Sequence, residues 1–117
     1  LVASDVEITQ PMPGRHMSAG YFVLTNNTDT PIRITGVTSP QFGMVEMHET
    51  TLEDGISRMR EIEELVVPAN GSVTFERGGK HLMLMRAQDL GQTVSLQLVS
   101  DGAPVLSIDY AFPEESP

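Results

Sequence analysis

The sequence predicts an all-β protein, a single domain of antiparallel Greek-key sandwich or barrel type. Runs rich in β-branched and aromatic side chains recur from one end of the chain to the other. Turn-forming residues separate these runs at intervals of about 8–12 residues, as in sandwiches and barrels. No stretch has a convincing helical period, and Pro68 limits the length of any turn near residues 63–65. At 117 residues the chain suffices for one self-supporting core.

The expected strands alternate in polarity or are almost wholly apolar, and several flank strong turn signals. A cluster at residues 26–29 predicts one hairpin, and Glu-Asp-Gly at 53–55 predicts a second. A further Asp-Gly turn lies at 101–102, and residues 113–117 are expected to form a polar, flexible tail. The strands are expected at residues 6–9, 21–25, 32–37, 44–49, 56–62, 65–67, 73–76, 81–85, 93–99 and 105–112.

Charge and cysteine content exclude several classes of function. The formal charge of −9 repels phosphate backbones and anionic lipid, so neither nucleic acid nor a membrane surface is an expected partner. No apolar run approaches the roughly 18 residues of a membrane span. With no cysteine, the chain cannot form a disulfide, a thiolate zinc site, an iron–sulfur cluster or a blue-copper centre. The chain starts at Leu1 without a leader, so we expect that any export signal has been removed.

Methionine and histidine carry the chemical signal of this sequence. The chain has seven methionines and three histidines, and each histidine has a methionine within two residues. His81 and Met83 are two apart on an expected strand, so their side chains share one face. His48 and Met59 are expected on the two arms of the second hairpin. Two imidazoles and two thioethers form a set that suits Cu(I), since thioether sulfur is soft and uncharged.

The other methionines have a simpler interpretation. Methionine on a strand commonly fills gaps in the core, so Met12, Met44, Met47 and Met85 are interpreted as packing or surface residues. The His16–Met17 pair follows a Pro-Gly turn and is interpreted as an ordinary surface pair, although it could approach the metal site. From the residues alone, a copper site and a packed β-domain both remain open.

The spacing of the four candidate ligands resembles that of the PCu(A)C copper chaperone family. The family signature His-x10-Met-x21-His-x-Met matches His48, Met59, His81 and Met83 without a gap. The flanking sequences are also similar: Met-His at 47–48, Arg-Met-Arg at 58–60, Pro-Ala-Asn-Gly at 68–71, and Gly-Gly-Lys-His at 78–81.

The resemblance implies a cupredoxin-like β-sandwich that carries Cu(I) in the periplasm or another extracytoplasmic compartment. It implies those four residues as copper ligands, and delivery to the dinuclear CuA centre of cytochrome c oxidase subunit II. We expect a monomer that transfers copper by ligand exchange and is not an enzyme, because no nucleophile elbow, nucleotide loop or carboxylate-rich metal set is present. The alternatives are an extracytoplasmic interaction module, or a copper buffer without a dedicated acceptor.

Overall fold

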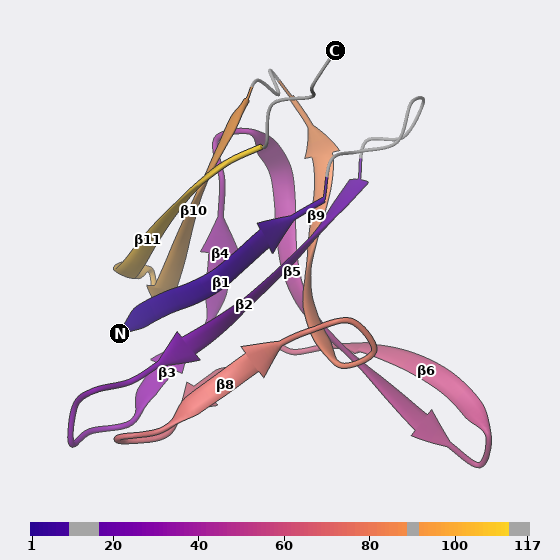
Figure 1. The fold of residues 1–117 in the computed structure, drawn as a ribbon, viewed down its shortest axis with the longest axis horizontal. Coiled ribbons are helices and arrows are strands. Elements are labelled where there is room, and N and C mark those ends of the chain that lie inside the picture. Colours follow the sequence, from indigo (N-terminus) through magenta and orange to yellow (C-terminus); the bar gives the residue numbers. More distant parts are fainter. Residues whose placement is uncertain (10–16, 89–91, 113–117) are drawn as a thin grey trace.

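The protein folds as an open β-sandwich, seen in a computed structural model that describes residues 1–9, 17–88 and 92–112 (Figure 1). All regular elements among these residues are strands, and the sheets do not close into a barrel. No helix in the described ranges is long and apolar enough to cross a bilayer. The strands are β1 (Val2–Ile8), β2 (Met17–Thr25), β3 (Ile32–Ile34), β4 (Gly36–Thr38), β5 (Phe42–Glu53), β6 (Ile56–Glu61), β7 (Leu65–Val67), β8 (Ser72–Phe75), β9 (Lys80–Ala87), β10 (Thr93–Ser100) and β11 (Ala103–Ala111).

The larger layer is a six-stranded sheet in the order β1-β2-β8-β9-β5-β6. β2 pairs with β9 through its first half and with β8 through its second half. The pairings are antiparallel except for one short parallel contact between β8 and β9. The other layer is a three-stranded sheet, β11-β10-β4, and β3 pairs with β7 in a small two-stranded sheet.

The hydrophobic core lies between the two larger sheets. Strict alternation places Val94, Leu96 and Leu98 of β10 in it, each almost fully buried. Leu82 and Leu84 of β9 enter from the opposite layer and are fully buried. Leu82 and Leu84 therefore face the core, and the residues that alternate with them on β9 lie on the outer face of the larger sheet. The run at residues 81–85 is almost wholly apolar, as in a strand covered on both faces, but the outer residues of β9 beyond position 81 are half-exposed.

Two of the turn signals are confirmed as hairpins. Asp54 and Gly55 both have a positive φ between β5 and β6, as do Asp101 and Gly102 between β10 and β11. Positive φ at both central residues is the geometry of the tight turn that matches strand twist. The β5–β6 hairpin projects from the body of the molecule (Figure 1).

The hairpin expected between residues 21–25 and 32–37 is wrong. The second segment splits into β3 and β4, which pair with β7 and β10 rather than with β2. The cause is Asn26, which is fully buried. Its amide donates to the carbonyls of Thr30 and Val67, at 2.8 and 3.2 Å, and its carbonyl accepts from Thr28. These bonds direct the chain away from β2 and toward the other layer.

Candidate metal centre

The outer face of the six-stranded sheet collects all four candidate ligands. In the β5–β9 pairing His48 lies opposite His81, and Met83 lies opposite Glu46. In the β5–β6 pairing Met59 lies opposite Thr50, which shares a face with His48 two residues away. The alternation of these strands therefore places His48, Met59, His81 and Met83 on one side of the sheet.

The two histidines are brought together directly. Their ring centroids are 5.8 Å apart with an interplanar angle of 36°. The His81 residue is only 9% exposed, and the His48 side chain 16%. The ring nitrogens of histidines this deeply buried need bonding partners, because an unpaired buried polar group is energetically costly.

Neighbouring acceptors determine which ring nitrogen of each histidine carries the proton. His48 Nε2 lies 3.0 Å from Glu46 Oε1, and a carboxylate only accepts, so Nε2 donates. His81 Nδ1 lies 3.4 Å from the Gly79 carbonyl and donates in the same way. In neutral rings the lone pairs are thus on His48 Nδ1 and His81 Nε2. This pattern, in which one nitrogen is anchored and the other is free to ligate, is typical of metal-binding histidines.

His48 Nδ1 is the atom of the site best suited to bind a metal ion. This atom is buried and has no hydrogen-bond partner in the part of the chain that the structure describes. A buried nitrogen lone pair is unfavourable unless a hydrogen-bond donor, such as a water molecule, or a cation lies in front of it. Its chemistry fits a metal ion that accepts imidazole nitrogen.

The two methionines flank the histidine pair unequally. Met83 is half-buried and lies two residues from His81 on the same strand. Met59 lies on β6, the edge strand, and is 52% exposed. Because β5 separates β6 from β9, Met59 and Met83 approach the histidines from opposite sides. The structure brings the imidazoles together and places both thioethers on their face.

A carboxylate pair adjoins the histidines. Glu61 lies opposite His48 in the β5–β6 pairing, and the nearby Glu46 carboxylate raises the pKa of Glu61 above its usual value. Glu46 was not identified from the sequence as the hydrogen-bond partner of His48. The Glu-x-His spacing at 46–48 was the available signal, because residues two apart on a strand share a face.

Of the remaining methionines and histidine, only some occur in the described residues. Met47 is 4% exposed and belongs to the core, as expected. Met44 is 38% exposed and Met85 is half-buried, so neither is a core residue. Met12 and His16 lie outside the described residues. No group of three or more His, Cys, Asp or Glu side chains in those residues is arranged around a possible metal ion.

The chain matches one protein family and two curated proteins. The chain matches the family described as "Putative lipoprotein LpqE-like" over residues 1–111. It is 30% identical over 95 residues to the putative lipoprotein Lxx21020 of Leifsonia xyli subsp. xyli, covering 77% of this chain and 57% of that protein. The chain spans 38% to 57% of the length of the two curated relatives it matches.

Solved structures of PCuAC domains share this architecture. The copper-bound PCuAC domain from PmoF2 superimposes with a TM-score of 0.74 at 24% identity, covering 98% of this chain and 92% of that one. The Cu(I) form of DR1885 from Deinococcus radiodurans gives a TM-score of 0.65 at 29% identity, covering 96% and 78%. The resemblance to the PCu(A)C family is thereby confirmed, and the chain belongs to the LpqE-like family, a PCuAC-related group of putative lipoproteins.

Proposed function

We propose that this protein is an extracytoplasmic metallochaperone that binds Cu(I) through His48, Met59, His81 and Met83. The observation that carries the proposal is the pair of adjacent imidazoles with oriented lone pairs, one of them on a buried nitrogen without a partner. Thioethers on the same face add soft, uncharged donors, which favour Cu(I) over zinc, magnesium or calcium. The copper-bound PmoF2 domain and the Cu(I) form of DR1885, which share the fold, support the choice of metal.

The exposure of the site suits a carrier rather than a store. Met59 is half-exposed at the sheet edge, so an acceptor can displace it first and then replace the remaining ligands one at a time. Thiolates are anionic and stronger donors than thioethers, so copper passes downhill to a cysteine site. This transfer needs no catalytic group, and the protein is proposed to act as a carrier and not as an enzyme.

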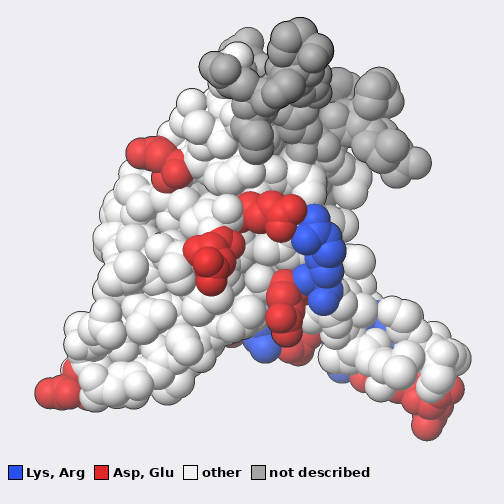
Figure 2. Space-filling view, in the orientation of Figure 1, with Lys and Arg blue, Asp and Glu red and all other residues white. Residues whose placement is uncertain are grey.

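The surface charge favours a cationic cargo without defining one docking patch. Figure 2 shows the acidic side chains in separate places on the face in view, one group lying at the tip of the β5–β6 hairpin. The net charge of −9 raises the local concentration of cations. The proposed compartment is supported by the lipoprotein descriptions of the family and of Lxx21020. The proposed acceptor is the CuA centre of cytochrome c oxidase subunit II, on the basis of the PCu(A)C resemblance.

The binding test is a competition titration with a chromophoric Cu(I) chelator under reductant. His48→Ala and His81→Ala should each weaken Cu(I) binding by at least roughly tenfold, since each removes one ligand. Glu49→Gln is the matched control, because Glu49 neighbours His48 but pairs with Lys80 at 2.9 Å. Circular dichroism of the copper-free proteins confirms folding. Wild-type affinity in both folded histidine variants would refute the site.

The transfer test separates a chaperone from a buffer. The Cu(I)-loaded protein is mixed with the copper-free soluble domain of an oxidase subunit II, and the absorption of the reconstituted centre is followed after oxidation. Rapid, stoichiometric transfer that exceeds the rate from a simple Cu(I) chelate supports delivery. Transfer no faster than from that chelate contradicts the proposed acceptor and favours buffering.

A further inference from the structure

A second group of thioethers lies on the same face of the sheet, at the end away from β6. Met17 of β2 is the register partner of Met85 of β9, and Met85 is the partner of Met44 of β5. Directly opposed residues of antiparallel strands have Cα atoms about 4.5–5.5 Å apart, with side chains on one face. Three methionines therefore form a row across three adjacent strands, with Met85 in the middle.

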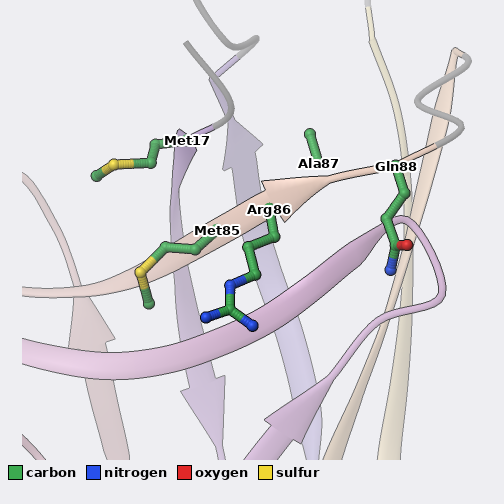
Figure 3. Close-up of a pocket in the computed structure, with 5 residues that line it drawn as sticks. All are labelled: Met17, Met85, Arg86, Ala87 and Gln88. Carbon is green, nitrogen blue, oxygen red and sulfur yellow. The ribbon is translucent and has the colours of Figure 1, made fainter.

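The Met17–Met85–Met44 row is not part of the core. Met17 is 47% exposed and Met44 38%, whereas Leu82 and Leu84 on the other face of β9 are fully buried. Figure 3 shows the Met17 and Met85 side chains extending to the same side of the sheet, at a surface hollow of about 630 Å³ that both line. Within residues 17–88 and 92–112, core packing does not account for three long apolar side chains aligned at a surface.

The row ends at the point where the side chains of β9 and β5 change the face of the sheet on which they lie. Arg86 has φ 58°, and the next residue, Ala87, packs against the core although Met85 does not. Phe42, the register partner of Ala87 on β5, is likewise buried, while Met44 is exposed. The left-handed residue thus reverses the alternation immediately after Met85, so Met85 is the last outward-facing methionine of β9.

The chemistry of the row selects a soft monovalent cation. Three thioethers offer neutral sulfur donors, which bind Cu(I) and its analogue Ag(I) and have little affinity for hard ions. Methionine has three rotatable bonds, so the outer two side chains can reach toward the central one. Arg86 lines the same hollow, and its repulsion of a divalent ion is twice that of a monovalent ion.

We propose that Met17, Met85 and Met44 form a second binding site for a soft monovalent metal ion, separate from the histidine pair. Met85 and Met83 are two residues apart on β9, which sets the two sites roughly 7 Å apart along the strand. The proposal goes beyond the copper-carrier function and does not depend on binding by His48 and His81.

The test uses Ag(I), which needs no reductant, with native mass spectrometry and methionine labelled at its ¹³C methyl group. The wild-type protein should bind two Ag(I) ions, and the variant with both His48→Ala and His81→Ala should keep one. The retained ion should shift the methyl signals of Met17, Met44 and Met85. Binding should persist at about pH 5, because thioethers do not titrate there.

Leucine substitutions identify the donors. Adding Met44→Leu and Met85→Leu to the histidine variant should abolish the remaining equivalent, since leucine conserves volume without sulfur. Met47→Leu, on the same strand but in the core, is the matched control and should keep it. The proposal is overturned if the histidine variant binds no Ag(I), or if binding survives loss of Met44 and Met85. If the wild-type protein binds one Ag(I) ion and the double histidine variant binds none, this second site is refuted while the proposed carrier function stands.

Discussion

Removal of the Glu46 carboxylate should weaken Cu(I) binding although Glu46 is not proposed as a ligand. Its Oε1 lies 3.0 Å from His48 Nε2, and the two side chains are 29% and 16% exposed. A hydrogen bond to a charged acceptor contributes about 1.5–3 kcal/mol when it is protected from water. Partners of this kind typically change metal affinity by about 10- to 100-fold, which is about 1.4–2.7 kcal/mol. The partial exposure of this pair places the expected loss for Glu46→Ala near the lower end of that range.

The assay compares Glu46→Ala, Glu46→Gln and wild type by Cu(I) chelator competition. Glutamine keeps an oxygen acceptor for Nε2, so Glu46→Gln should bind more tightly than Glu46→Ala. Glu49→Gln again serves as the control on the same strand. Glu61 faces His48 across the hairpin and could take over the hydrogen bond of the removed Glu46 carboxylate. The variants are therefore repeated in combination with Glu61→Gln. Wild-type affinity in Glu46→Ala, with and without Glu61→Gln, would refute the orienting role.

Two further predictions concern the copper-free protein. Asn26→Ala should destabilise the fold by about 2–4 kcal/mol, lowering Tm by roughly 10 °C, because four side-chain hydrogen bonds are lost and the Val67 carbonyl loses a donor; calorimetry that shows under about 1 kcal/mol would contradict this. Glu61→Gln should raise Tm at about pH 7, because the raised pKa of Glu61 means that its ionised form is disfavoured in the folded state. Protonated Glu61 contributes its full stability below the pKa of the unfolded state, near 4.5, and this contribution is lost as pH rises through the pKa of the folded state. The Tm advantage of Glu61→Gln over wild type should therefore shrink toward pH 4.5. A Tm difference that grows on acidification would show the opposite sign of coupling.

The strength of the local turn signal decides which hairpins could be predicted from the sequence. Asp54–Gly55 and Asp101–Gly102 adopt positive φ, which glycine favours, and both hairpins form where expected. Residues 26–31 contain no glycine and none has a positive φ. In that segment the side chain of Asn26 is buried and donates a hydrogen bond to the carbonyl of Val67, 41 residues away. The local sequence pattern cannot reveal such a long-range contact.

The candidate site was only partly predictable for a similar reason. Spacing alone places His81 and Met83 on one face, because the period of a strand is two. The opposition of His48 to His81 depends on pairing between strands 33 residues apart, and only the family resemblance pointed to it. The methionine row was missed because Met17, Met44 and Met85 come from three separate strands, and core packing is the commoner role for methionine.

The position of Met59 has a consequence for the dynamics of the β5–β6 hairpin. β6 is an edge strand, its residues are all exposed, and its ladder partner is β5 alone. Such a strand opens at low free energy, so its amides exchange rapidly in the copper-free protein. If Cu(I) links Met59 to the central histidines, loading must hold β6 in place and slow exchange over residues 56–61, by about tenfold for each 1.4 kcal/mol of coupling. Met59→Leu should abolish this slowing while the β10–β11 hairpin exchanges as before; unchanged slowing in Met59→Leu would mean that the copper ligands lie on β5 and β9 alone.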